Sequence, residues 1–503
     1  MTTSWPSPAL PGSNPDPSIV LVDGLYYLVT SSFEYLPGLP IYRSADLVTW
    51  DQIGNVATRA EQVWFDDVHT PGGVWAPTIR HYDGLFHVIV SVFLGGRGCV
   101  VFTAAEAAGP WSDGIVIDAV DGIDPDLAWD DEGTAYVSYA SFGRGILQVR
   151  VDLETGRALE EPRLLWAGTG LLGTEGPHLY HRGGSWLLVV AEGGTDRGHA
   201  VSVARGPSPM GPFESCPNNP VLSARSTAYP VQNLGHADLV EAPDGGTAMV
   251  LLGVRPIDAA LGFSPLGRET FVTRVSWVDG WPMPEVPASG PGAAAERFRA
   301  DLTDGSVLDA PGWLAVRRTP RSVAQVDDGA LVIDGDARIT DSCPAFLGRR
   351  QRHHDSVFVA LVDASKGTGG VAARLREDHT IAIEASDNGE RTLVTAHAIL
   401  AGLEQTWTAE LPSGPARLSI ETEILPVDLR RGLIGGEVIR LVARATDAPL
   451  VLAELDGRYW SYETAKAFTG RIVGVYAETG RVRFLEIGYD GLAGTAAPDA
   501  TLS

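Results

Sequence analysis

The sequence predicts an all-β protein, a five-bladed β-propeller followed by a jelly-roll-like β-sandwich, on three observations. Short alternating or wholly apolar runs, broken by Gly, Pro, Asp and Asn, dominate the chain, and helical periodicity is scarce. A turn glycine followed by an apolar strand recurs five times, at a spacing typical of propeller blades. From about residue 300 the short strands continue without that spacing, as they do in a sandwich.

The repeated units fill residues 1–285, which we expect to form the propeller. Their turn glycines lie 60, 49, 50 and 62 residues apart, and each comes just before an apolar run such as LYYLVTSSF or LFHVIVSVF. The five glycines are Gly24, Gly84, Gly133, Gly183 and Gly245. Five units over about 280 residues is a normal length per blade.

Two further segments follow the predicted propeller. Residues 286–300 are rich in Pro, Ala and Gly, which is typical of a linker or of a strap along the surface. Residues 301–503 contain about nine short strands, among them SVFVALVDA and IRLVARATD, and predict the sandwich. A second propeller is the alternative for this region, but no repeat recurs there to favour it.

Length and charge limit the classes of partner. The 503-residue chain is too long for one hydrophobic core and suggests two or three domains. Its 38 basic and 63 acidic residues give a net charge of −25, so nucleic acid and anionic lipid, which need a basic surface, are not expected partners. No apolar run reaches the roughly 18 residues of a membrane span, so no membrane association is expected either.

The ends and cysteines of the chain bear on its location. The first residues, MTTSWPSPALPGSNPDPS, lack the basic and apolar regions of a secretory signal. Cys99, Cys216 and Cys343 are scattered without metal-ligand spacing, which predicts buried thiols in a reducing compartment. We therefore expect a cytoplasmic protein, and we expect it to be a homo-oligomer.

One position of the repeated unit carries side chains with chemical potential. The residues eight or nine positions before the five turn glycines are Asp16, Trp75, Asp124, Glu175 and His236. The first strand of every propeller blade lines the central channel, so these side chains should converge there. Prolines beside the carboxylates, in NPDPS, GIDPD and TEGP, fix how each strand enters the channel.

Three carboxylates in one channel match the chemistry of glycosidic bond hydrolysis. A carboxylic acid protonates the leaving oxygen, and in inverting enzymes a carboxylate about 6.5–9.5 Å away activates the attacking water. Blades that face each other across a narrow channel can hold such a pair. The third carboxylate also has a task, because a negative Asp124 near Glu175 would raise the pKa of Glu175 and keep it protonated near neutral pH.

A set of motifs follows in order along nearly the whole chain. They include NPDPSIV, SSFEYLPGLPIYRSADLVTW, GGVWAPTIRHYDG, GIDPDLAWDDEGTAYV, GTEGPHLY, GHADLVE and LGRETF. These segments resemble the β-xylosidases of glycoside hydrolase family 43. The later segments FLGRRQRH and AFTGRIVGVYAE resemble the appended β-sandwich of that two-domain group. One departure is Asn14, which stands where many relatives have an aromatic residue before P-D-P.

The resemblance implies roles for the three carboxylates. Asp16 would be the general base, Glu175 the general acid, and Asp124 the residue that tunes and orients Glu175. Arg268, in LGRETF, matches a family arginine that reaches the sugar in the first subsite.

The resemblance also implies an aromatic lining of the site. Phe33 and Trp75 would form a platform that faces the sugar, although without the resemblance core packing is an equal interpretation. Phe468, in AFTG, would reach the mouth of the site from the sandwich. His236 has three interpretations: it binds substrate, it holds a calcium ion in the channel through the ion's solvent shell, or it is structural. No cofactor is expected to be required.

The expected activity is that of an exo-acting, inverting hydrolase that releases xylose from the non-reducing end of β-1,4-xylo-oligosaccharides. Exo action is implied by the resemblance, because the sandwich of that group blocks one end of the channel. The nearest alternative is an α-L-arabinofuranosidase, or an enzyme with both activities. A sugar-binding propeller without catalysis is the third hypothesis, but such propellers usually repeat their site in each blade, whereas here each blade supplies a different residue to one centre.

Overall fold

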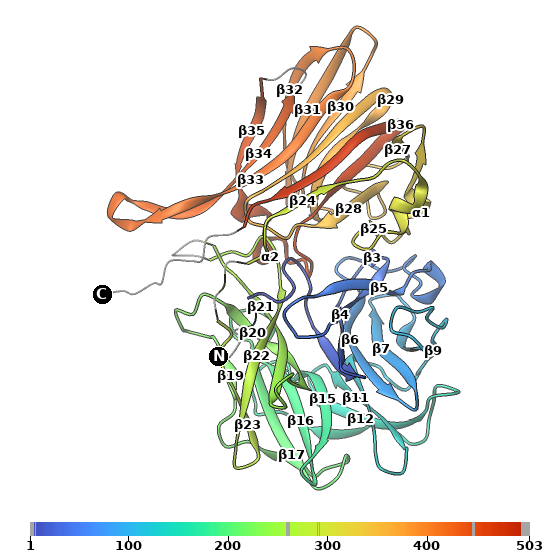
Figure 1. The fold of residues 1–503 in the computed structure, drawn as a ribbon, viewed down its shortest axis with the longest axis vertical. Coiled ribbons are helices and arrows are strands. Elements are labelled where there is room, and N and C mark those ends of the chain that lie inside the picture. Colours follow the sequence, from blue (N-terminus) through green and yellow to red (C-terminus); the bar gives the residue numbers. More distant parts are fainter. Residues whose placement is uncertain are drawn as a thin grey trace.

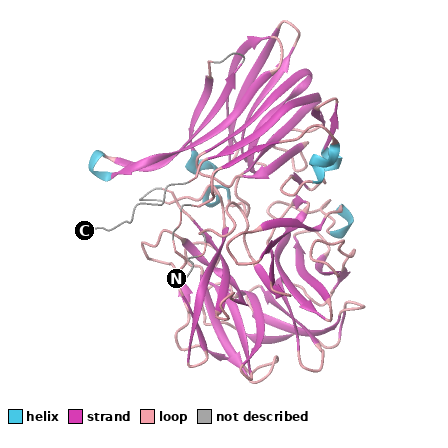
Figure 2. Ribbon diagram, viewed as in Figure 1, coloured by secondary structure: helices cyan, strands magenta, loops and turns pink. Residues whose placement is uncertain are grey.

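The computed structural model describes residues 5, 7–257, 262–288, 290, 292–444 and 448–493. Figure 1 shows a propeller with a twisted β-sandwich stacked against it, and Figure 2 shows that strands dominate both parts. The all-β prediction, with a five-bladed propeller followed by a sandwich, is confirmed. Among the described residues, no helix is long and apolar enough to cross a membrane.

Each propeller blade is an antiparallel sheet whose first four strands pair in chain order from the centre outward; in blades 3 and 4 a fifth strand pairs with the third strand of the blade. Blade 1 consists of β1 Ser18–Val22, β2 Leu25–Val29, β4 Gly38–Ser44 and β5 Asp51–Ala57, and blade 2 of β6 Gly73–Tyr82, β7 Leu85–Phe93, β8 Gly98–Ala104 and β9 Ile115–Val116. Blade 3 consists of β10 Ile123–Trp129, β11 Ala135–Ser141, β12 Gly145–Asp152, β13 Arg157–Ala158 and β14 Arg163–Trp166. Blade 4 consists of β15 Glu175–Arg182, β16 Ser185–Glu192, β17 Ala200–Gly206, β18 Glu214–Ser215 and β19 Leu222–Ser223, and blade 5 of β20 Gln232–Glu241, β21 Thr247–Val254, β22 Glu269–Val278 and β23 Trp281–Pro284.

The innermost strand of each blade has an irregular start with a left-handed residue. These residues are Asp16 (φ 56°), Ala76 (φ 40°), Asp124 (φ 54°), Gly176 (φ 55°) and His236 (φ 50°). In blades 2 to 5 the residue lies inside a register shift between the first two strands. A bulge of this kind leaves a residue unpaired and re-aims the neighbouring side chains, here at the point where the strand meets the central channel.

A buried polar network crosses the channel two to four residues further along these strands. Nη1 of Arg80 lies 2.9 Å from Oδ2 of Asp238, and Nη2 lies 2.8 Å from Oδ1 of Asp126. Ser18 Oγ donates to the same Asp238 oxygen at 2.6 Å. Burial opposes the charge of Asp238, but Arg80 outweighs it and holds the pKa of Asp238 well below its usual range. The N–H of Leu179, on the inner strand of blade 4, also donates to Oδ2 of Asp126 at 2.9 Å. We call this network the channel floor; it ties the inner strands of all five blades together.

The sandwich is built on two long paired strands, β29 and β36, which belong to both of its layers. Its strands are β24 Glu296–Arg299, β25 Leu314–Val316, β26 Ala324–Asp327, β27 Ala330–Gly335, β28 Phe346–Arg350, β29 Ser356–Arg376, β30 His379–Asp387, β31 Arg391–Leu400, β32 Leu403–Pro412, β33 Ala416–Asp428, β34 Leu433–Arg444, β35 Leu450–Asp456 and β36 Ile472–Gly491. Short helical turns connect them: η2 Gly305–Asp309, α1 Pro320–Val323, η3 Leu429–Arg431, η4 Gly457–Trp460 and α2 Tyr462–Ala465. The propeller adds η1 Ala60–Gln62.

The segment expected as a linker, 286–300, contains one of these strands. β24 pairs with β36 and therefore belongs to the sandwich. The run ERFR is too short and too charged to show strand periodicity by itself, so only its pairing partner identifies it. Residues 289 and 291 of the expected linker lie outside the described residues.

The two domains are joined through a shared sheet. β3, Tyr35–Leu36 in the propeller, pairs antiparallel with β25 of the sandwich. The buried ring of Tyr35 packs in one hydrophobic cluster with sandwich residues that include Phe346 and Tyr476. Nε of Arg350 also donates to the carbonyl oxygen of Ser13 at 2.7 Å. The sandwich is thus fixed next to the loop of blade 1 that follows β2.

Candidate active site

A small cavity of about 100 Å³ lies where the inner strands of the five blades meet the sandwich. Its lining comprises Asp16, Phe33, Trp75, Ala76, Ile123, Asp124, Glu175, Thr195, His236, Arg268 and Phe468. All eight residues singled out from the sequence are among them. Every blade contributes at least one side chain, and Phe468 comes from the sandwich.

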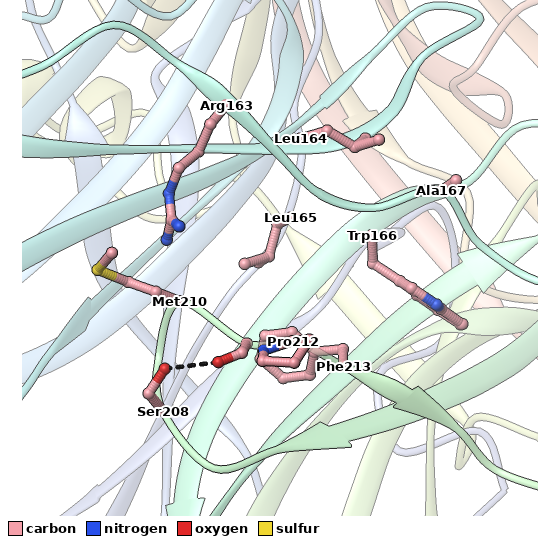
Figure 3. A pocket seen from close by; sticks show the side chains of 10 residues that line it. Arg163, Leu164, Leu165, Trp166, Ala167, Ser208, Met210, Pro212 and Phe213 are labelled. Atoms are coloured by element: carbon pink, nitrogen blue, oxygen red, sulfur yellow. Dashed lines mark hydrogen bonds between the residues drawn. The ribbon is translucent and has the colours of Figure 1, made fainter.

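A larger hollow of about 620 Å³ lies on the outer side of the propeller, between β14 and the loop that leads to β18 (Figure 3). Its lining is mostly apolar and includes one ionisable side chain, Arg163. Ser208 is engaged with the carbonyl oxygen of Gly211 at 2.8 Å (Figure 3). Because this hollow has no acid or base to transfer protons, the smaller cavity is the candidate active site.

Asp16 is held as a carboxylate. Ser31 Oγ donates to its Oδ2 at 2.6 Å, and Nη1 of Arg268 lies 3.1 Å from its Oδ1. Burial alone would raise the pKa of Asp16, but Arg268 and the Ser31 hydrogen bond outweigh burial and hold the pKa below its usual value. Asp16 is therefore ionised at neutral pH, as a general base must be.

Glu175 and Asp124 titrate as a pair. Desolvation in the pocket, and after it the charge of Asp16, raises the pKa of Glu175 to about 7. Burial and the neighbouring carboxylates, Glu175 first, raise the pKa of Asp124 as well. Since repulsion between two carboxylates is mutual, the pair holds one proton near neutral pH. The contribution of Asp16 was not foreseen from the sequence.

A backbone hydrogen bond distinguishes Asp124 from Glu175. The N–H of Gly176 donates to Oδ2 of Asp124 at 3.1 Å, across from blade 4 to blade 3. A hydrogen bond from a donor favours the ionised form of the carboxylate that accepts it. This contact favours a proton on Glu175, although burial and the two neighbouring carboxylates still raise the pKa of Asp124.

Arg268 links the carboxylates to the pocket wall. Besides Asp16, its Nη1 donates to Thr195 Oγ1 at 3.0 Å, and its Nη2 donates to the carbonyl oxygen of Phe468 at 3.3 Å. The guanidinium carbon lies 5.7 Å from the ring centre of Phe33 and 5.2 Å from that of Phe468. A cation held by aromatic faces and by hydrogen bonds keeps a fixed orientation toward the pocket.

Three aromatic rings form one wall of the pocket. Phe33 and Phe468 stack with ring centres 5.8 Å apart, and Trp75 meets Phe468 edge-to-face at 4.9 Å. The indole N–H of Trp75 is satisfied by the carbonyl oxygen of Pro71 at 2.9 Å. Phe33 and Trp75 therefore line the pocket and also pack against other rings, so the platform and packing interpretations describe the same side chains.

His236 is uncharged at neutral pH. Burial lowers the pKa of His236 to about 4, and its Nδ1 lies 3.7 Å from Oδ1 of Asp16. The ring packs against Gly176, where a Cβ would lie 3.0 Å from it, so a larger residue at 176 would displace the imidazole. Within the described ranges, no group of three or more His, Cys, Asp or Glu side chains has the arrangement of a metal site. The calcium interpretation of His236 stays a prediction.

Some lining residues were not predicted from the sequence. Thr195 lies in the segment AEGGT, for which no role was predicted, and Ala76 and Ile123 are apolar neighbours of predicted residues. Ser31 follows the apolar run of the first repeat; besides bonding Asp16, its Oγ accepts the N–H of Ala76 at 2.7 Å. A hydroxyl that ends a propeller strand is a weak signal by itself, because most such groups cap turns.

Comparison with known proteins identifies both domains. Residues 5–282 match the family model of glycosyl hydrolases family 43, and residues 310–482 match the β-xylosidase C-terminal concanavalin A-like domain. The chain is 33% identical, over 94% of its own length and 90% of the relative, to a non-reducing end α-L-arabinofuranosidase of Bacteroides ovatus. It is 30% identical to a xylosidase/arabinosidase of Butyrivibrio fibrisolvens, over 94% of this chain and 95% of the relative.

Solved structures agree over both domains. The family 43 protein B of a Bacteroides ovatus xyloglucan locus superposes with a TM-score of 0.86 at 31% identity, covering 97% of this chain and all of that one. A xylan β-1,4-xylosidase of Bacillus halodurans superposes with a TM-score of 0.85 at 24% identity over 97% and 100% of the two chains, which supports the fold. With the family model covering more than half of the chain, the protein belongs to glycosyl hydrolases family 43 and is a glycoside hydrolase.

Proposed function

We propose that the protein is an exo-acting, inverting β-xylosidase that releases xylose from the non-reducing end of β-1,4-xylo-oligosaccharides. The observation that carries the proposal is the meeting of Asp16, Asp124 and Glu175 in one small pocket whose wall is completed by Phe468 of the sandwich. A pocket of about 100 Å³, lined from both domains, suits the end of a sugar chain better than its middle.

In the proposed reaction, ionised Asp16 and protonated Glu175 have separate tasks. Ionised Asp16 takes a proton from water, and the water oxygen bonds to the anomeric carbon from one face. On the other face Glu175 gives its proton to the glycosidic oxygen as the bond to that oxygen breaks. Asp124 orients Glu175 through the Gly176 N–H contact and, when ionised, helps to keep it protonated. The free sugar then has the inverted α configuration.

An α-L-arabinofuranosidase is the second candidate. It is favoured by the relative from Bacteroides ovatus, which is named for that activity and matches over nearly the full length of both chains. The relative from Butyrivibrio fibrisolvens is named for both activities. The same three carboxylates would act on either sugar, so the choice depends on how the aromatic wall and Arg268 fit the pentose ring.

Side-by-side kinetics and one NMR experiment test the proposal. Initial rates on nitrophenyl β-xyloside and nitrophenyl α-arabinofuranoside should favour the xyloside, and the reverse preference would establish the second candidate. Proton NMR of a fresh xyloside digest should show α-xylose first. Initial release of β-xylose would mean retention and would contradict the assignment of Asp16 as general base.

Location and assembly remain part of the proposal. Of the three cysteines predicted to be buried thiols, Cys99 and Cys216 are buried, whereas Cys343 is only partly buried; all three are free, which supports a reducing compartment. Cell fractionation tests the cytoplasmic location, and light scattering on the purified chain tests the expected homo-oligomer.

A further inference from the structure

One segment of the sandwich carries everything that this domain contributes to the pocket. We call Gly457–Arg471 the closing segment; it contains η4, α2 and the loop with Phe468. Its Tyr462 ring centre lies 5.8 Å from the Arg268 guanidinium carbon, and the Tyr462 hydroxyl donates to Asp196 at 3.0 Å. Phe468 supplies both a ring to the aromatic wall and a carbonyl oxygen to Arg268.

The closing segment is interlocked with the propeller loop that precedes Arg268. The N–H of Ser264 donates to Glu463 Oε2 at 2.8 Å, and the N–H of Arg471 donates to the carbonyl oxygen of Pro265 at 3.4 Å. The two backbones approach so closely at Gly470 that a Cβ there would lie 2.2 Å from the carbonyl oxygen of Leu266. Any displacement of the closing segment is therefore transmitted to Arg268.

A buried ion pair anchors this segment inside the sandwich. Arg471 donates from Nη1 and Nη2 to the two carboxylate oxygens of Glu437, on β34, at 2.8 and 2.6 Å, and both side chains are fully enclosed. The same guanidinium donates to the carbonyl oxygens of Trp460 at 2.7 Å and Gly457 at 2.8 Å. Arg471, the last residue of the closing segment, thus binds the first turn of that segment and the neighbouring strand β34.

Stability alone is a weak reason for such a pair. Replacement of a buried ion pair by packed apolar side chains is often neutral or stabilising, because the two charges lose their hydration. What apolar side chains cannot replace is the set of directed hydrogen bonds to Trp460 and Gly457. These bonds fix where the segment, and with it Phe468, stands relative to the propeller.

We propose that Arg471 and Glu437 are positioning residues for the active site, acting through the closing segment on Phe468 and Arg268. The pair touches neither the pocket nor the carboxylates. Its effect falls mainly on sugar binding through Phe468, because Asp16 keeps its hydrogen bond from Ser31 when Arg268 shifts. This inference rests on the proposed function of the pocket.

The test compares Arg471→Met, Glu437→Leu and the double variant in the full-length protein. Each single variant leaves a buried charge or a gap and should lower the Tm; the double variant should recover most of that loss. We expect KM on nitrophenyl β-xyloside to rise about tenfold in the double variant while kcat changes less than about threefold. A double variant with recovered Tm and an unchanged KM would overturn the proposal.

A stability-matched control separates positioning from general weakening. Phe358, on β29, is 1% exposed in the sandwich core and takes no part in the hydrogen bonds of Arg471 and Glu437, so Phe358→Leu should lower Tm through core packing. Its KM should equal that of the unmodified chain. An equal rise of KM in Phe358→Leu would show that any loss of sandwich stability suffices, and the positioning role would be wrong.

Hydrogen exchange supplies a readout that needs no turnover. Amides of the closing segment and of residues 264–268 should lose protection in the double variant and keep it in Phe358→Leu. If the unmodified chain hydrolysed neither aryl glycoside, the proposed function would fail, while this exchange pattern would still decide the positioning role. Unchanged protection of both segments in the double variant would overturn the positioning role by itself.

Discussion

The propeller and the sandwich contribute to one pocket by opposite means. The carboxylates stand on inner strands whose left-handed starts and channel floor fix the backbone itself. Phe468 stands on a segment without a long strand or helix, held in place by side chains such as Arg471. The groups assigned to proton transfer are therefore placed by a backbone feature that recurs in every blade. The sandwich's contribution to sugar binding is placed by a few side-chain contacts.

The largest effect is expected from Asp16→Ala, which removes the proposed general base from the start of the inner strand of blade 1. We expect kcat/KM to fall by about 10²–10⁴ on activated and unactivated substrates alike, because every substrate needs the water to be activated. Steady-state rates on nitrophenyl β-xyloside and xylobiose measure this. Asp46→Ala is the control: Asp46 is an exposed aspartate of the same blade that caps a turn, and its loss should leave the rates unchanged. A similar loss of kcat/KM in both variants would contradict the assignment of Asp16 as general base.

Glu175→Ala should show a smaller effect that depends on the leaving group. Xylobiose needs protonation of its leaving oxygen, while nitrophenolate leaves without it, so the loss should be much greater for xylobiose. Comparison of kcat/KM across a series of aryl xylosides measures the dependence. Equal losses for all leaving groups would contradict the division of roles between Asp16 and Glu175.

Phe468→Ala tests what the sandwich contributes to the pocket. Loss of the ring removes the contacts with Phe33 and Trp75 and opens the wall, so KM should rise about tenfold with a modest change in kcat. Phe142, an aromatic residue that is 66% exposed and does not line the pocket, offers a matched Phe→Ala control. A fall of kcat as deep as that of Asp16→Ala would mean that the wall takes part in the chemistry.

Asp124→Asn should move the pH profile by a small amount. Asp124 raises the pKa of Glu175 only when it is ionised, so a neutral asparagine lets Glu175 lose its proton earlier. The alkaline limb of kcat/KM, which we expect near pH 7, should shift to lower pH by up to about one unit, or about 1.4 kcal/mol. The acid limb, set mainly by Asp16, should move less. Lost activity with an unmoved alkaline limb would leave Asp124 an orienting role alone.

Metal removal is expected to have the smallest effect. Both proton transfers are assigned to carboxylates, and neutral His236 is already in contact with Asp16 and Gly176. Dialysis against EDTA should leave kcat/KM unchanged, and calcium addition should not raise it. A loss that calcium restores would establish the calcium interpretation of His236.

The repeated part of the site could be predicted from the sequence because its signal is periodic. Glycine spacing alone led to the inner strands of all five blades. The exact register did not follow, since Trp75 and Glu175 stand one residue before the left-handed positions while Asp16, Asp124 and His236 occupy them. A bulge changes by one the number of residues between the left-handed position and the turn glycine, and a hydrophobic pattern does not reveal it.

The unrepeated part was accessible only through family resemblance or not at all. Arg268 lies 252 residues from the Asp16 that it binds, and Phe468 lies 200 residues from Arg268, so no local pattern relates them. The two-residue strand β3 is too short for any periodicity, although it joins the domains. The Arg471–Glu437 pair looks in sequence like two ordinary surface charges, because burial of a charge depends on its distant partner.

The channel floor has a consequence for the order of events in a catalytic cycle. Because Arg80 and its carboxylate partners bridge the inner strands just beyond the pocket residues, we expect a ligand to enter and leave by the same opening. A sugar bound at the inner end cannot depart until the piece cleaved from it has moved away. For the proposed exo-acting hydrolysis we therefore expect ordered release, with the shortened chain first and the monosaccharide last. We then expect the free pentose to compete directly with new substrate, so that its accumulation slows the proposed reaction.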